Sequence, residues 1–446
     1  MSSSPSSKKL PTSAPLPPPS PHVPTMGAPR FRPTSGTFST KGGVIVHRQL
    51  TLLSRSEFEK EADSLVNALD ERRGCIFESS YEYPGRYARW TMGFVDPPLV
   101  LEGRARHFEI RALNERGQVL LPAIYDVLER CKDVHTVSID NTNTQLMQIT
   151  GTVRTLPDGT RFPEEQRSKQ PSIFSVVREM TALFGIDPAI DPQLGLYGSF
   201  GYDLTFQFET VKFHHQRDIN AEGRPTQRDL LLYLPDSIIV LDGQAKDAYR
   251  VDYDFSWNNT TTRNMERTGN SVPFTGVTEL KKRRDHAPGA YSKKVDLAKE
   301  QFRVGNLFEC VLSQVFYEPC AAPPSEILRR LRIRNPSPYM FIINLGSGEH
   351  LVGRLLACYC CWTVVMVTEQ ILCSCCSPFS SFEFPSLFFV SISPHYTTTL
   401  QVHLPKCLSA ANTRTIMACV SRHVQLVAPS NVVPMRWRMP NASKRF

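Results

Sequence analysis

The spacing of apolar residues predicts a domain of mixed helices and strands that begins near Gly42. In residues 55–72, apolar side chains recur at three- and four-residue steps with polar residues between them, which is typical of an amphipathic helix. Further helices are predicted over residues 291–305 and 325–332, the latter entered through Pro323 and Pro324. Short β-rich runs bounded by Pro, Gly or Asp predict strands at residues 75–79, 108–113, 146–154, 230–235 and 237–242.

These elements are interspersed, without a strict alternation of strand and helix and without an internal repeat. Such an order favours an α+β fold with layered antiparallel sheets over a doubly wound parallel one. Residues 257–285 are polar and irregular, which predicts a linker or long surface loop. Within it, the basic run at residues 281–284 is typical of a solvated surface segment. The predicted organisation therefore has one lobe at residues 42–256 and a second that starts at residue 286.

Both ends of the chain differ from this body. Residues 1–41 combine Ser, Pro and scattered positive charge without a hydrophobic period, which predicts a disordered leader. The lack of acidic residues there is also typical of an organelle transit peptide, so plastid and cytoplasmic locations both stay open. Residues 354–446 contain eight of the 12 cysteines and two acidic residues.

Net charge narrows the class of protein. The chain carries +8, but residues 48–353 hold 38 basic and 41 acidic side chains, so the excess lies in the two ends. A mildly acidic body offers no basic surface for nucleic acid. No secretory signal and no apolar run of membrane-spanning length occurs, and the four cysteines of the body predict a reduced protein without disulfides.

Three stretches carry specific chemistry: CIFESSYEYPGRYARW (residues 75–90), YGSFGYDLTFQF (197–208), and GNLFECVLSQVF (305–316) with NPSPYMF (335–341). In this order they resemble component I of anthranilate synthase, a chorismate-using lyase, nearest the α-proteobacterial type that is fused to a glutaminase domain. The resemblance runs from about Gly42 to Gly353. It implies a reaction of chorismate with ammonia or glutamine that yields anthranilate and pyruvate in tryptophan biosynthesis.

A small amino-acid pocket is predicted where the first and third stretches meet. Glu78 and Ser79, at a strand end, can orient a ligand ammonium, and Tyr339 with Met340 offers a ring and a thioether to an indole. A packed strand pair with a tight turn explains the same residues without a ligand. The resemblance favours the pocket, since it implies feedback inhibition by tryptophan bound at Glu78, Ser79, Pro338, Tyr339 and Met340.

The resemblance also implies Mg²⁺ as cofactor, but in the family the metal ligands, the chorismate-binding segments and the catalytic residues follow the position equivalent to Gly353. Residues 354–446 offer Glu369 and Glu383 alone, too few for a carboxylate cage. No catalytic or metal-binding residue is therefore predicted in this chain, whose activity is expected to be incomplete. The simplest interpretation of the segment is translated non-coding sequence, such as a retained intron or a frame shift.

Residues 354–446 and the function of the chain each have alternative interpretations. The repeated C-x-C-C spacing at residues 358–361 and 373–376 could bind zinc or copper(I) instead. A non-catalytic tryptophan-binding fragment and an aminodeoxychorismate synthase-like protein are the alternative functions. A separate glutaminase subunit and a homodimer are the partners considered. A sheet cut near Gly353 is expected to leave unpaired strand edge and poor solubility.

Overall fold

The computed structural model describes most of the chain between residues 34 and 355, together with two later strands. The described residues are 34–79, 90–140, 146–157, 160, 162–163, 166, 169–208, 228–243, 246–277, 279, 283–284, 286–307, 310, 312, 314–334, 336–337, 339–355, 387–392 and 399–403. The predicted leader falls outside them up to residue 33, as does most of the segment after residue 355. None of the helices in this part of the chain is both long and apolar enough to cross a membrane.

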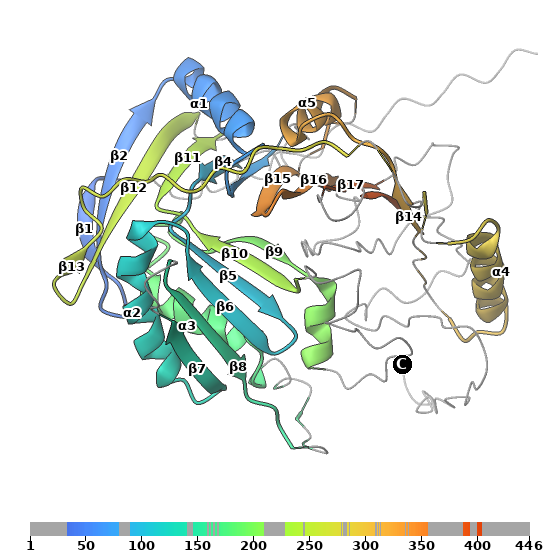
Figure 1. Ribbon diagram of the computed structural model, residues 1–446, viewed down its shortest axis with the longest axis horizontal. Helices are drawn as coiled ribbons and strands as arrows, with labels where there is room; N and C mark the ends of the chain where they lie inside the picture. Colours follow the sequence, from blue (N-terminus) through green and yellow to red (C-terminus); the bar gives the residue numbers. More distant parts are fainter. Residues whose placement is uncertain are drawn as a thin grey trace, which may run out of the picture. The chain divides into compact units, whose positions relative to one another are not determined.

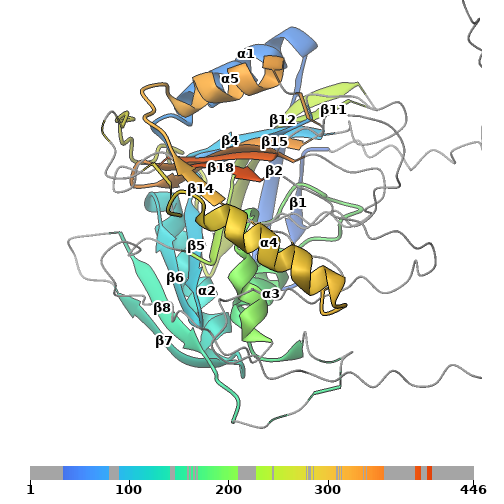
Figure 2. The ribbon, with the colours of Figure 1, turned by 90° about the vertical axis from the view of Figure 1, so that its right-hand side faces the viewer.

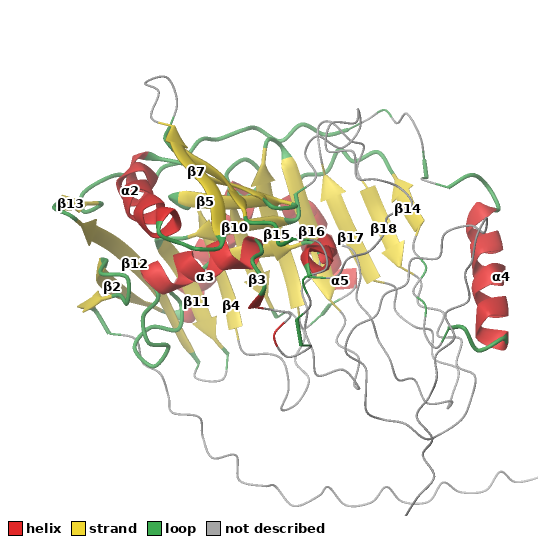
Figure 3. Ribbon diagram, turned by 90° about the horizontal axis from the view of Figure 1, so that it is seen from below, coloured by secondary structure: helices red, strands yellow, loops and turns green. Residues whose placement is uncertain are grey.

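A large antiparallel sheet organises the described residues (Figure 1). Its order is β1 (Gly36–Ser39), β2 (Ile45–Leu53), β12 (Asp247–Trp257), β11 (Ser237–Asp242), β4 (Trp90–Val95), β3 (Gly74–Glu78), β15 (Tyr339–Gly346), β16 (Glu349–Leu355), β17 (Leu387–Ile392), β18 (Thr399–His403) and β14 (Gln314–Tyr317), with β13 (Thr260–Thr261) beside β12. Figure 3 shows the strands from β15 to β14 side by side. The sheet thus joins segments from both predicted lobes.

A second antiparallel sheet lies below the first in Figure 1. It contains, in spatial order, β7 (Val134–Asp140), β8 (Gln148–Val153), β6 (His107–Ala112), β5 (Leu99–Arg104), β10 (Leu230–Leu234) and β9 (Tyr197–Phe200), followed in the chain by a 3-10 helix, η2 (Tyr202–Gln207). Helices with antiparallel sheets confirm the predicted α+β class.

Two helices, α1 (Arg55–Ala68) and α5 (Pro324–Arg334), cover one face of the large sheet and lie next to each other (Figure 2). The start of α1 is set by a capping box, in which the Ser54 hydroxyl accepts from the Glu57 N–H and the Glu57 carboxylate accepts from the Ser54 N–H. Its apolar stripe packs with Leu328 of α5 against the sheet. Arg329 of α5 then donates to Asp63 and Asn67 of α1, which joins the two helices across their exposed edges.

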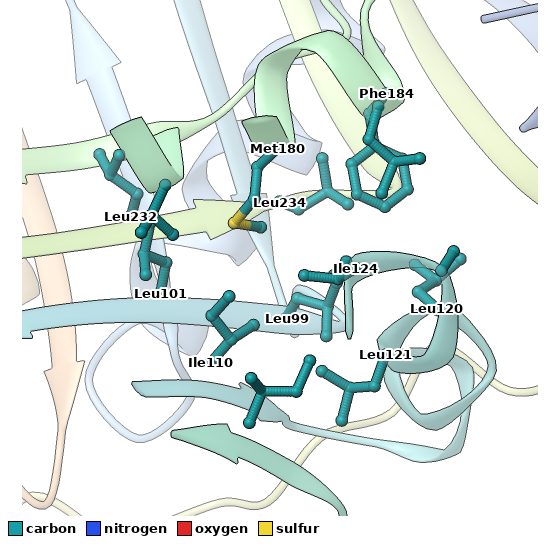
Figure 4. Packing of buried hydrophobic residues seen from close by; sticks show 14 of the residues in the cluster. Leu99, Leu101, Ile110, Leu120, Leu121, Ile124, Met180, Phe184, Leu232 and Leu234 are labelled. Atoms are coloured by element: carbon teal, nitrogen blue, oxygen red, sulfur yellow. The ribbon is translucent and has the colours of Figure 1, made fainter. Parts of the chain in front are cut away.

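The other main helices, α2 (Glu115–Glu129) and α3 (Ile173–Phe184), pack against the smaller sheet. Figure 4 shows their side chains meeting those of the strands in one buried cluster. The labelled members are Leu99, Leu101, Ile110, Leu120, Leu121, Ile124, Met180, Phe184, Leu232 and Leu234. Because these residues are at most 3% exposed, the cluster forms the main hydrophobic core of the described part. The last long helix is α4 (Ala290–Arg303).

The elements predicted from periodicity are present at nearly their expected positions, and the strand at residues 237–242 has the predicted bounds. Three expectations differ from the structure. Residues 36–39 of the predicted disordered leader form strand β1, which pairs with β2. The described part of residues 257–285 is mostly exposed or half-buried, but Thr262 is fully buried and its hydroxyl accepts the Phe255 N–H. The sheet does not end near Gly353 either, because β17 pairs with β16 from His350 to Gly353, so the expected unpaired edge was wrong.

The buried guanidinium of Arg116 joins α2 to this segment and to the large sheet. It forms an ion pair with Asp236 and donates to the carbonyl oxygens of Thr262 and Tyr253 (2.5 and 2.8 Å). Both side chains of the ion pair are at most 2% exposed. Burial raises the pKa of Asp236, although Arg116 and Arg267 act in the opposite direction. Arg116 therefore neutralises a carboxylate that would otherwise be buried alone.

We expect Arg116→Met to lower the free energy of unfolding by about 3–5 kcal/mol, because the variant leaves Asp236 buried without its main partner. The pKa of Asp236 should rise further, and a carboxyl group with a raised folded-state pKa contributes most stability at low pH. The loss should therefore be smaller at about pH 5 than at about pH 8.

Urea denaturation at both pH values measures this loss. Arg55→Met is the matched control, since the Arg55–Glu59 pair is 66% and 60% exposed and should contribute at most about 0.5 kcal/mol. Equal effects of the two substitutions would contradict the buried ion pair.

Candidate functional site

The candidate site lies where strands β3 and β15 pair. The register places Met340 opposite Glu78 and Phe341 opposite Phe77. The two stretches that the sequence predicted to meet are therefore adjacent, although about 260 residues separate them in the chain. The site is at the carboxyl end of β3 and the amino end of β15.

Strand alternation divides the predicted residues between two faces of the sheet. Ile76, Ile342 and Met340 belong to the core under α1 and α5, whereas Cys75, Phe341 and Ile343 belong to the core on the other side. Glu78 follows Ile76 by two positions, so its side chain shares the α5 face with Met340. Tyr339 and Ser79, each one position away, lie in register for the opposite face. A ligand at this strand end could reach both pairs of side chains only by lying across the end of the strands.

Pro338 lies outside the described residues. Its neighbour Ser337 is fully buried, and the Ser337 hydroxyl accepts from the Tyr339 N–H at 3.3 Å. Tyr339 is half-buried, while the Met340 side chain is 1% exposed. Met340 thus acts as a core residue in this structure, and Tyr339 retains exposed surface.

Glu78 forms a two-pronged ion pair with Arg332 of α5. The Arg332 Nε lies 3.1 Å from Oε1 and 2.9 Å from Oε2 of Glu78, and Nη2 lies 2.8 Å from Oε1. Exposure of the two side chains is 10% for Glu78 and 30% for Arg332. Arg332 is the functional-site residue that sequence reasoning missed, because no local pattern indicates a partner 254 positions away.

Arg332 reaches the sheet because of its position on α5. Leu328, four residues earlier, lies on the same side of the helix and is fully buried in the core with Met340. On the far side of Met340 from Glu78, Arg354 of β16 pairs with Met340 and is fully buried. Burial lowers the pKa of Arg354. Among the residues that the structure describes, the α5 face of the site therefore contains the Glu78 carboxylate and the guanidinium groups of Arg332 and Arg354.

The opposite end of these strands is held by polar contacts to α1. The main-chain oxygen of Leu69, which caps α1, accepts from the Asn344 side-chain amide at 3.0 Å and lies 3.1 Å from Nε2 of His350. Desolvation lowers the pKa of His350. A cavity of about 220 Å³ borders this end, with Arg73, Asp96 and Gly346 in its wall. The candidate site and this cavity are at different ends of β3.

A buried ion network joins the smaller sheet to β16. Arg228 binds Glu102 of β5 at 3.0 Å and also binds Glu349 of β16 (2.5 Å). Burial acts to raise the pKa of Glu102, but Arg228, Arg111 and Arg73 outweigh it and the pKa is lowered. These charges stabilise the contact between the sheets rather than form a reactive centre.

Within the part of the chain that the structure describes, no three His, Cys, Asp or Glu side chains gather in a way that could hold a metal ion. The carboxylates named above accept instead from arginine. The described residues therefore do not fit a magnesium site.

The comparisons with known proteins extend over the same segments. Residues 140–354 match the model of the family described as chorismate binding enzyme. Over 316 residues the chain is 43% identical to the anthranilate synthase of Azospirillum brasilense, an alignment that covers 71% of this chain and 41% of that protein. The chain belongs to the anthranilate synthase component I family.

Two further relatives agree with this assignment. Anthranilate synthase component 1 of Buchnera aphidicola subsp. Pemphigus spyrothecae is 23% identical over 298 residues, which cover 64% of this chain and 54% of the relative. The chloroplastic anthranilate synthase alpha subunit 2 of Arabidopsis thaliana is 32% identical over 184 residues, 35% of this chain and 29% of the relative. The chain thus spans about half or less of the length of these family members.

The family match ends at residue 354, next to the position where the sequence pattern changes. It begins at residue 140, well before residue 286, where the second lobe is expected to start. Strands β8, β9 and β10 of the smaller sheet and the site strand β15 lie inside the match, whereas β5 and β6 lie before it. Strand β3, which contributes Glu78, lies outside it.

The buried position of Met340 leads to a stability prediction. We expect Met340→Ala to lower the free energy of unfolding by about 2–5 kcal/mol, because it leaves a cavity between α5 and the sheet. Met340→Leu conserves volume and should cost less than about 1.5 kcal/mol. Thermal and urea unfolding of both variants measures the difference. Similar, small losses in both would show that the side chain is not packed under α5.

Proposed function

We propose that this chain is a catalytically incomplete anthranilate synthase component I, the lyase that by family converts chorismate and ammonia to anthranilate and pyruvate in tryptophan biosynthesis. The observation that carries the proposal is the 43% identity over 316 residues to an anthranilate synthase, together with the match to chorismate-binding enzymes. Aminodeoxychorismate synthase is the alternative of the same class, and this identity disfavours it.

The proposal assigns binding rather than catalysis to the described residues. Ring amination and elimination of pyruvate need a general acid and base and, by family, Mg²⁺. The described residues group no metal-ligand set, so the proposal assigns them no contact with the ion. The chain is proposed to have little or no turnover of chorismate. In this proposal, residues 286–353 are the start of the chorismate-binding part and residues 42–256 are a regulatory lobe.

The regulatory site is proposed at the end of β3 and β15, where tryptophan would bind with contacts to Glu78, Ser79, Pro338, Tyr339 and Met340. The adjacency of Glu78 and Met340 supports this position. The Glu78 carboxylate provides a negative charge for the ligand ammonium, and the half-buried Tyr339 provides a ring for the indole. Met340 is packed in the core, so its main role in the proposed site is to support the neighbouring residues that the ligand contacts.

The further assignments rest on the family and the composition. A separate glutaminase subunit could supply ammonia, and a homodimer is the proposed assembly. The Ser- and Pro-rich leader and the chloroplastic relative support a plastid location, with the cytoplasm as the other candidate.

Two measurements on the purified 446-residue chain test the function. Isothermal titration calorimetry with tryptophan should show binding to one site per chain, and fluorescence detection of anthranilate in chorismate, ammonium and Mg²⁺ should show little or no product. Ser79→Ala should weaken tryptophan binding by about tenfold, since one hydrogen bond to a charged group contributes about 1.5 kcal/mol.

Each result has a distinct meaning. Binding without turnover favours the non-catalytic tryptophan-binding form of this chain, consistent with the missing metal-ligand set in the described part. Rapid turnover would contradict the proposed catalytic incompleteness. Absence of both binding and turnover would reject the assignment for this chain, and formation of aminodeoxychorismate would favour the alternative enzyme.

A further inference from the structure

We propose that Arg332 competes with the ligand for Glu78, so that an ammonium group bound at this strand end displaces the Arg332 guanidinium and releases the last turn of α5. This inference rests on the proposed tryptophan site and adds its mode of regulation. It assigns Arg332 as a positioning residue, because Arg332 acts through Glu78.

The Glu78 carboxylate is already occupied by Arg332. Arg332 uses both oxygen atoms of Glu78, with three nitrogen–oxygen distances between 2.8 and 3.1 Å. Glu78 is 10% exposed and, within the described residues, Arg332 is its ion-pair partner. A ligand ammonium can approach this carboxylate closely only against the neighbouring guanidinium charge, which water screens weakly at this depth. If the ligand ammonium replaces the Arg332 guanidinium as the partner of Glu78, that repulsion disappears and the buried carboxylate stays neutralised.

The position of Arg332 on its helix determines which residues its release would affect. It lies in the last turn of α5, and the guanidinium–carboxylate pair joins that turn to the end of β3. The preceding turn is fixed independently by the burial of Leu328 and by Arg329, which donates to Asp63 and Asn67 of α1 at 2.7 Å. Loss of the Glu78 contact would therefore loosen residues 332–334 without detaching the helix.

The charge on this face of the sheet also favours the exchange of partners. Arg354 is fully buried on the far side of Met340 from Glu78, so this face of the sheet holds a second cationic side chain besides Arg332. A cationic ligand would be opposed here unless one guanidinium group withdraws. Arg332, at 30% exposure, can move into solvent at less cost than the buried Arg354.

The test compares three ligands that share the indole ring: tryptophan, tryptamine and indole-3-propionate, of which the last has no ammonium group. In Arg332→Gln, tryptophan and tryptamine should bind about five- to tenfold more tightly than in the wild type, since one opposing charge is removed. Indole-3-propionate should not gain affinity. Arg332→Lys, which keeps the charge, should return both amines toward wild-type affinity.

Arg330→Gln is the matched control. It makes the same substitution on the same helix, at a residue whose ion pair with Glu326 is 62% and 44% exposed, and should leave all three affinities unchanged. Hydrogen exchange of the wild-type chain adds a readout that needs no variant: tryptophan should speed exchange at the amides of residues 332–334.

The outcomes separate this inference from the function on which it rests. If the wild type binds tryptophan but Arg332→Gln shifts all three ligands equally, or shifts none, the competition is wrong while the site stands. Slower exchange at residues 332–334 with tryptophan would also overturn it. If the wild type binds none of the ligands, the tryptophan site and the competition both fail.

Discussion

The antiparallel pairing of β3 with β15 is the constraint on which the rest of the site depends. It joins residues near position 76 to residues near position 342, and its register decides which side chains face α5. A shift of one residue would exchange the two faces and move Ile76, Met340 and Ile342 out of their shared core. The same shift would turn Glu78 away from Arg332. Hydrophobic packing on both faces thus fixes the position of the polar residues at the strand end.

How far the sequence predicts the structure depends on whether the relevant contacts are local. The α1 helix and the strand at residues 237–242 have patterns confined to their own segments, and both are found as expected. Helix α2 contains Pro122, which removes an internal hydrogen bond, and its start is capped by the Asn114 side chain, which accepts from the Gly117 N–H. The polar composition of residues 257–285 predicts a loop, but long-range partners such as Arg116 bury Thr262. Composition alone does not reveal such partners.

The candidate site shows the same division. Local motifs show a strand end at Glu78 and an extended segment before Met340, and the family resemblance was needed to predict that the two form one site. The motifs were not sufficient to separate Met340 from Tyr339, because that separation follows from strand alternation within a sheet buried on both sides. They also could not identify Arg332, whose role depends on how α5 crosses β15 and β16. Electrostatic partners at a site are therefore the part of the function that needs the three-dimensional structure.

The position of the site also explains how occupancy could act beyond it. A ligand shifts an equilibrium only by its difference in affinity for two states, and an ammonium that exchanges with a guanidinium group for one carboxylate supplies such a difference. Helix α5 packs against β15 and β16, and β16 is in turn bound to the smaller sheet through Glu349, Arg228 and Glu102. The last turn of α5 lies at the Met340 end of these strands and the ion network at their Gly346 end, so β15 and β16 connect the two. Because buried charges lose much energy when their geometry changes, this network is more sensitive to small displacements than an apolar contact of equal size would be.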